Sequence, residues 1–156
     1  MQLVVLGKGD QKYEEFFDWA AKQYPGRLAV RLAYNEALSM AIYAGADLFL
    51  MPSKSEPCGL SQMIAMRYGA VPIVRETGGL RDTVQAYEAW CGAGNGFTFA
   101  KYNAHDMLHV IYEALELYYT NREAFNQLQQ RGMTADFSWN RSAREYMRIY
   151  RYAAEH

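Results

Sequence analysis

The chain has 156 residues, of which 51% are hydrophobic, 15% aromatic and 21% charged. That length suits one globular domain, and the apolar content excludes a disordered chain. Sixteen Lys and Arg residues against seventeen Asp and Glu residues leave a formal net charge of −1, which gives no general reason to expect nucleic acid or a membrane as a partner. No apolar run approaches the roughly 20 residues that span a membrane. Two cysteines cannot make a disulfide framework, so we expect a cytoplasmic protein.

Short β-rich runs alternate with helical patterns over the first two-thirds of the chain. The compact apolar runs predict strands over residues 3–6, 28–32, 47–51, 71–74 and 96–99. The helical spacing between them predicts helices over residues 13–24, 35–43, 59–68 and 79–90. Pro25 and Gly26 end the first of these helices, and Asn35 can cap the second.

Only helical patterns follow, over residues 105–119, 122–133 and 138–154. The first has an apolar stripe of Leu108, Ile111, Leu115 and Tyr118. The last has an apolar face of Trp139, Ala143, Tyr146, Met147 and Tyr150. Five strands separated by helices predict a Rossmann-like α/β fold, with a parallel sheet, helices on both of its faces and a helical C-terminal tail. We expect one domain over residues 1–156, with an α/β core to about residue 135 and a final helix in 136–156.

In such a sheet, ligands bind beyond the carboxyl ends of the strands, and the loop of residues 52–62 is the richest candidate there. Pro57 restrains Glu56 to an extended conformation, and Gly59 lets the backbone approach a ligand closely. The free amides of residues 58–61 begin a helix, so they can attract phosphate or donate to hydroxyl groups. The same residues fit an ordinary strand-to-helix turn equally well, with Glu56 as a surface charge.

A second loop, residues 76–82, has two adjacent glycines, Gly78 and Gly79. Adjacent glycines permit positive φ and bare-backbone contact with a ligand. Thr77 and Asp82 can equally be capping residues that serve only the following helix.

Three further observations on the sequence argue against a dinucleotide cofactor or a metal. Residues 7–10 suggest a dinucleotide fingerprint, but Lys12 stands where the third glycine is needed. His105 and His109 lie four apart without the glutamate or third ligand of a zinc site. No Asp-x-Asp occurs to hold a metal-bound diphosphate. We therefore expect no metal and no dinucleotide cofactor.

Two other features have simpler interpretations. The arginines of the last helix form a stripe that acidic residues interrupt, which is typical of a solvated face rather than an RNA-binding one: Arg141, Arg144, Arg148 and Arg151. Cys58 at a helix start would have an activated thiol, but no histidine lies in any candidate loop, so the sequence does not favour a nucleophilic role.

Two motifs closely resemble bacterial glycogen synthases and plant starch synthases. They are Glu56-Pro57-Cys58-Gly59-Leu60, within residues 46–60, and Thr77-Gly78-Gly79-Leu80, within residues 77–84. Residues 6–10, 34–37, 95–99 and 136–139 resemble the same family in the same order. The resemblance covers essentially the whole chain, and the two motifs together are highly specific.

The resemblance implies a retaining glucosyltransferase of the GT-B fold that uses ADP-glucose to extend an α-1,4-glucan at its non-reducing end. It implies that this chain is the C-terminal, donor-binding domain of such an enzyme. The N-terminal domain with most of the acceptor contacts, the first strand of the C-terminal domain and a diphosphate-clamping Arg/Lys pair would lie outside this sequence. The final helix would cross to the missing domain, and the isolated chain would be inactive.

The resemblance also implies roles for individual residues. Glu56 would lie beside the donor glucose, near its anomeric centre, as the catalytic residue. The remaining donor-binding residues would be Tyr34 against adenine, Cys58 and Gly59 at the sugar hydroxyls, Leu60 and Ser61 at the distal phosphate, and Thr77, Gly78 and Gly79 lining the pocket. ADP would depart without a metal, and the glucan hydroxyl would attack from the same face.

Two alternatives remain at this stage. The chain can be a stand-alone, non-catalytic module that binds a nucleotide or a sugar. It can also belong to a GT-B transferase that uses a UDP-sugar.

Overall fold

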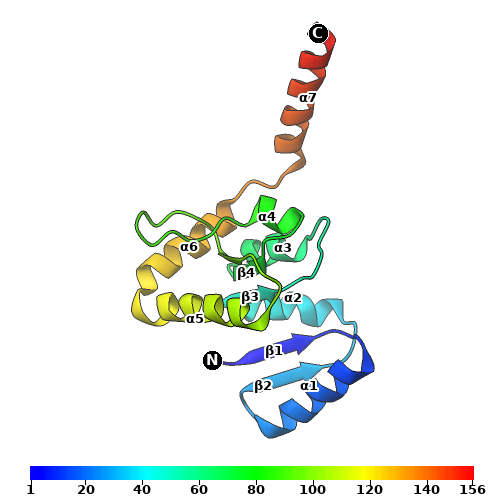
Figure 1. Cartoon of the computed structure of the whole chain (residues 1–156), viewed down its shortest axis with the longest axis vertical. Helices are drawn as coiled ribbons and strands as arrows, with labels where there is room; N and C mark the ends of the chain where they lie inside the picture. The colour runs from blue at the N-terminus through cyan, green and yellow to red at the C-terminus, as the bar shows by residue number, and fades with distance from the viewer. The chain divides into compact units, whose positions relative to one another are not determined.

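The computed structural model describes residues 1–156 and contains five strands and seven helices (Figure 1). The strands are β1 (Leu3–Leu6), β2 (Leu28–Arg31), β3 (Leu48–Met51), β4 (Val71–Arg75) and β5 (Phe97–Phe99). The helices are α1 (Gln11–Gln23), α2 (Glu36–Gly45), α3 (Ser61–Arg67), α4 (Gly79–Thr83), α5 (Ala104–Thr120), α6 (Arg122–Thr134) and α7 (Trp139–Glu155). Every predicted strand and helix is present, although α4 is much shorter than predicted.

The chain divides into two compact units, residues 1–45 and 46–156. In the first unit, β1 and β2 pair in parallel, and α1 packs against β2 through its buried residue Ala20. Asn35 caps α2 as predicted, because its Oδ1 accepts the Leu38 amide at 2.9 Å. The assignment of all 156 residues to one domain stays a prediction.

The second unit contains a parallel sheet with the strand order β3-β4-β5. Met51 of β3 lies opposite Val74 of β4, and Ile73 of β4 lies opposite Phe97 of β5. The parallel pairing is confirmed in both units, with β1 beside β2 in the first and the order β3-β4-β5 in the second.

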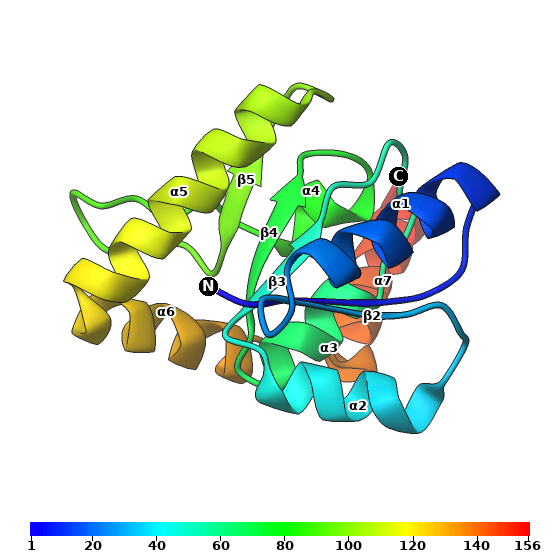
Figure 2. The same ribbon diagram turned by 90° about the horizontal axis from the view of Figure 1, so that it is seen from below.

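Helices cover both faces of the β3-β4-β5 sheet because side chains alternate along β4 (Figure 2). Val71 and Ile73 face α5 and α6, in a core completed by Phe97, Phe99, Val110, Ala114, Phe125 and Leu128. Val74 faces α3 and α4, in a second core with Met66, Leu80 and Val84. The predicted layering of helices about a parallel sheet is therefore confirmed in this unit.

The helix predicted over residues 79–90 is wrong beyond Thr83. The Asn95 side chain donates to the Thr83 carbonyl at 3.0 Å and accepts the Gln85 amide at 2.7 Å. Val84 is extended and buried instead of helical. A Cβ on Gly96 would lie 2.6 Å from a Val84 methyl group, so only glycine lets the returning chain pack there. These tertiary contacts override the helical pattern.

The stripe predicted on α5 is only partly correct. Ile111 and Tyr118 pack against the core as predicted, but Leu108 is 46% exposed. The buried face is centred on Val110 and Ala114. The helix has apolar residues on most of its sides, so the spacing in the sequence alone does not determine which side faces the core.

The last helix, α7, has no buried residue, and its apolar face is exposed. No helix of the chain combines the length and apolar character needed to span a membrane.

Replacing Asn95 tests the contact that ends α4. Asn95→Ala removes both hydrogen bonds and leaves the partly buried Thr83 carbonyl and the exposed Gln85 amide without their Asn95 partner, so we expect it to lower the free energy of unfolding by about 1–3 kcal/mol. The measurement is urea unfolding followed by circular dichroism. Asn126→Ala, an exposed position on α6, is the control and should change it by less than about 0.5 kcal/mol. Equal effects of the two substitutions would contradict this account of α4.

Candidate functional site

Both predicted loops lie at one edge of the β3-β4-β5 sheet. The Glu56 loop (residues 52–61, ending on the first residue of α3) follows β3, and the Gly78 loop (residues 76–79, ending on the first residue of α4) follows β4. Since β3 and β4 are parallel neighbours, their carboxyl ends meet at the same edge. The sheet thus brings together the two motifs that the sequence singled out.

The backbones of the two loops touch. The Gly79 amide donates to the Glu56 carbonyl at 3.1 Å. Gly78 has φ +47°, and a Cβ there would lie 2.1 Å from the same carbonyl oxygen. A Cβ on Gly79 would lie 3.2 Å from Cys58 Cα. The paired glycines therefore allow the two loops to pack backbone against backbone.

A chain of hydrogen bonds joins the far end of the Glu56 loop to α4. Gln62 Nε2 donates to the Gly59 carbonyl at 2.6 Å and to Thr83 Oγ1 at 3.0 Å. Thr83 Oγ1 donates in turn to the Gly79 carbonyl at 2.8 Å. Gln62 is completely buried, and we call this chain of three bonds the Gln62–Thr83 brace.

Arg75, the last residue of β4, holds the start of the Glu56 loop. Its Nε donates to the Ser53 carbonyl at 2.8 Å, and its Nη2 donates to the Lys54 carbonyl. Its Nη1 reaches the Ala100 carbonyl beyond β5 at 3.5 Å, and the guanidinium lies 5.5 Å from the ring centroid of Tyr102. The Glu56 loop is thus fixed at both ends.

Sequence reasoning missed both Gln62 and Arg75, although each left a signal. Gln62 shares a helix face with the buried Ala65 and Met66, so it is a polar residue in a core position. Arg75 follows four buried strand residues directly. A charged or amide side chain in such a place needs partners nearby, and here those partners are loop carbonyls.

The Glu56 loop leaves its last amides available. None of the backbone N–H groups of residues 58–61 donates to a protein acceptor. The Glu56 side chain beside them is half-buried. Donors and a carboxylate side by side suit a ligand that carries both phosphate and hydroxyl groups.

The remaining predicted site residues have diverse surroundings. Leu60 is 61% exposed, and the Cys58 thiol is free and exposed. Thr77 is half-buried, and its amide donates to the Arg75 carbonyl at 2.8 Å. Tyr34 belongs to the unit of residues 1–45, where it follows β2 and is 88% exposed. The roles of these residues stay predictions.

His109, one of the two histidines that lie four residues apart, has an acidic neighbour on its own helix. His109 Nε2 lies 3.5 Å from Glu113 Oε1, one turn along α5. No group of three or more potential ligands from His, Cys, Asp and Glu gathers in the chain. That the protein works without a metal stays a prediction.

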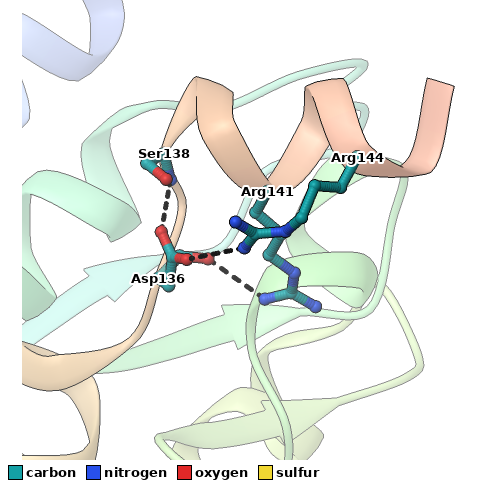
Figure 3. Close-up of polar contacts among 4 residues, drawn as sticks. All are labelled: Asp136, Ser138, Arg141 and Arg144. Carbon is teal, nitrogen blue, oxygen red and sulfur yellow. Dashed lines mark hydrogen bonds and ion pairs between the residues drawn. The ribbon is translucent and has the colours of Figure 1, made fainter. Parts of the chain in front are cut away.

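A second polar cluster lies at the start of α7 (Figure 3). Asp136 Oδ1 accepts the Ser138 amide at 2.9 Å, and Arg141 Nη1 donates to the Asp136 carbonyl at 3.1 Å. Arg144 Nη2 lies 3.9 Å from Asp136 Oδ2. Hydrogen bonds from Ser138, followed by the charges of Arg144 and Arg141, lower the pKa of the Asp136 carboxyl. Two members of the arginine stripe therefore serve the entry into α7.

A hollow of about 530 Å³ adjoins this cluster, between α7 and the α3–α4 side of the unit. It is lined by Met63, Asp82, Thr83, Asp136, Phe137, Ser138, Arg141, Ser142, Glu145, Tyr146 and Ile149. None of the predicted site residues lines it.

The architecture matches known glycosyltransferase structures. The catalytic domain of starch synthase IV from Arabidopsis thaliana, solved bound to ADP and acarbose, is similar with a TM-score of 0.85 and 37% identity. That match covers 99% of this chain and 33% of the starch synthase chain. Parallel strands, helices on both faces and loops gathered at the carboxyl edge thus define part of a GT-B glycosyltransferase catalytic domain.

The family follows from the sequence. The model of glycosyl transferases group 1 matches residues 1–132, and the chain belongs to this family. Among curated proteins, it is 52% identical over 151 residues to a glycogen synthase of Bacillus anthracis. It is 57% identical over 150 residues to a glycogen synthase of Geobacillus thermodenitrificans. These matches cover 97% and 96% of the chain but only 32% and 31% of the relatives, so the chain spans about a third of their length.

Substituting Gly78 tests the backbone contact between the loops. Gly78→Ala places a methyl group against the Glu56 carbonyl at a backbone conformation that favours glycine. We expect the loops to separate and the free energy of unfolding to fall by about 1–3 kcal/mol, measured by urea unfolding. Gly9→Ala, where a Cβ meets open space, is the control. A Gly78→Ala protein as stable as the control would contradict the contact.

The lowered pKa of Asp136 predicts a pH effect. The folded pKa lies below the reference value of 3.8, so the charged carboxylate stabilises the α7 entry above pH 3.8. That stabilisation is lost as the pH falls through the folded pKa. An NMR titration of the Ser138 amide should therefore show a midpoint below 3.8. Asp136→Asn, which keeps an oxygen acceptor but does not titrate, should abolish the transition. A midpoint at or above 3.8 would contradict the assignment.

Proposed function

We propose that this chain is the donor-binding C-terminal part of a glycogen synthase, which transfers glucose from ADP-glucose to the non-reducing end of an α-1,4-glucan with retention. One observation carries the proposal. The Glu56 and Gly78 loops, which hold the two family motifs, are joined by a direct backbone hydrogen bond at the carboxyl edge of the sheet. Ligands of parallel α/β sheets bind at that edge.

The free amides of the Glu56 loop suit the diphosphate of the donor. In our proposal the Leu60 amide and Ser61 meet the distal phosphate, and Cys58 and Gly59 contact the glucose hydroxyls through their backbone. Amides with no protein acceptor at the start of a helix stabilise negative charge without a metal. That charge grows as ADP departs, so these donors favour the bond-breaking step, and no cofactor is required.

Glu56 is proposed to lie beside the anomeric carbon. Its half-buried carboxylate would stabilise positive charge that develops at that carbon as the bond to phosphate breaks. The glucan hydroxyl would attack from the face that ADP leaves, and its proton would pass to the departing phosphate oxygen. The anomeric configuration would be retained.

The nucleotide and the pocket walls complete the proposal. Tyr34 has an exposed ring that can stack on adenine, and Thr77, Gly78 and Gly79 would line the donor pocket. ADP as the nucleotide is supported by the starch synthase IV structure, which was solved with ADP. The glucan acceptor, a cytoplasmic location and the absence of a metal are parts of the same proposal. Glucan synthesis would need the segments that the longer relatives have and this sequence lacks.

Calorimetric titration of the chain tests this function. We expect ADP and ADP-glucose to bind weakly, with Kd values on the order of 1 mM, and UDP to bind more weakly. Glu56→Gln should weaken ADP-glucose binding but leave ADP binding unchanged, because the carboxylate faces the sugar. Glu113→Gln on α5 is the matched control. The chain alone should make no glucan.

Three results would contradict the proposal. No heat at several millimolar ADP or ADP-glucose would exclude a donor site in this chain. A clear preference for UDP would assign it to a transferase that uses UDP-sugars. Glucan synthesis by the chain alone would show that the additional segments are not needed.

A further inference from the structure

The Gln62–Thr83 brace controls a peptide plane in the candidate site. The Gly59 carbonyl and the Leu60 N–H belong to one planar peptide unit and point in opposite directions. Gln62 Nε2 holds that carbonyl at 2.6 Å from a fully buried position. The Leu60 N–H is therefore directed away from the buried side chain, and it has no protein acceptor.

Thr83 links Gln62 to the Gly78 loop. Its hydroxyl accepts from Gln62 and donates to the Gly79 carbonyl. The Gly79 amide bonds the Glu56 carbonyl at 3.1 Å. The orientation of the Gly59–Leu60 peptide is thus tied to the position of the Gly78 loop through one continuous set of hydrogen bonds.

Stability alone does not explain Gln62. Its Oε1 is buried without a hydrogen-bond partner, which costs free energy that an apolar side chain of the same size would avoid. Oε1 also lies 2.7 Å from where a Cβ on Gly59 would stand, so a larger residue at Gly59 would have to displace the Gln62 amide. The two hydrogen bonds that Gln62 Nε2 donates, to the Gly59 carbonyl and to Thr83 Oγ1, account for a buried amide at this position.

We propose that Gln62 and Thr83 are positioning residues that orient the Leu60 amide toward the donor phosphate and fix the distance between the two loops. This inference rests on the proposed function for its ligand. The brace itself is a property of the chain without ligand. Neither residue touches the donor, and both act through Gly59 and Gly79.

The test uses three variants and one control in the whole chain. Gln62→Met keeps the volume and removes both donors, and Thr83→Val removes the hydroxyl at constant shape. Thr83→Ser keeps the hydroxyl and should rescue the effect. Gln129→Met is the matched control, because Gln129 Nε2 also holds a backbone carbonyl, that of Gly69 at 2.7 Å, away from both loops.

Two measurements separate positioning from simple stability. The residual dipolar coupling of the Leu60 N–H, measured by NMR without ligand, reports the peptide orientation. Calorimetry reports the Kd for ADP at a temperature where all variants are folded. We expect Gln62→Met and Thr83→Val to change the coupling and to weaken ADP binding about fivefold, as the loss of one net hydrogen bond implies. Thr83→Ser and Gln129→Met should leave both unchanged.

The double variant is expected to bind ADP no more weakly than Gln62→Met, because both residues act in one chain of bonds. Unchanged coupling in Gln62→Met and Thr83→Val would overturn the proposal, and so would altered coupling with ADP affinity equal to that of Gln129→Met. If the unsubstituted chain binds no ADP, the proposed function fails. In that case the residual dipolar coupling of the Leu60 N–H alone shows whether the brace orients the Gly59–Leu60 peptide.

Discussion

The candidate site depends on one contact, the approach of the Gly78 loop to the Glu56 carbonyl. The Gly79 amide bonds that carbonyl at 3.1 Å, and a Cβ on Gly78 would lie 2.1 Å from it. Any other residue at Gly78 would push the loops apart, and the free amides of one loop would no longer adjoin the glycines of the other. Glu56 and Gly78, 22 residues apart in the sequence, belong to one site because parallel strands deliver their loops to the same edge.

Polar side chains from the surrounding core hold this contact from both ends. Arg75 fixes the start of the Glu56 loop through the Ser53 and Lys54 carbonyls. Gln62 and Thr83 fix its end. Loops that bind ligands are usually less stable than the elements they connect. Here side-chain donors, of which Gln62 is fully buried, replace the missing secondary-structure bonds, so the amides that point outward keep a defined direction before any ligand arrives.

The sequence predicted most elements because their signals are local. The apolar run of β4, the Asn35 cap and the glycines beside Thr77 needed no knowledge of the rest of the chain. The failures came from distant partners. Asn95 and Gly96 end α4 from twelve and thirteen residues beyond Thr83. In the site, the motifs located both loops, but the brace that orients them became visible only in the three-dimensional structure.

The central claim is that the two joined loops form a nucleotide-sugar donor site, and an NMR titration of the chain with ADP tests it most directly. The account predicts saturable shifts confined to the amides of the Glu56 loop, the start of α3 and the Gly78 loop, with neighbouring shifts in the brace. Saturable shifts elsewhere, for example in the hollow beside α7, or no shifts at millimolar ADP would contradict it.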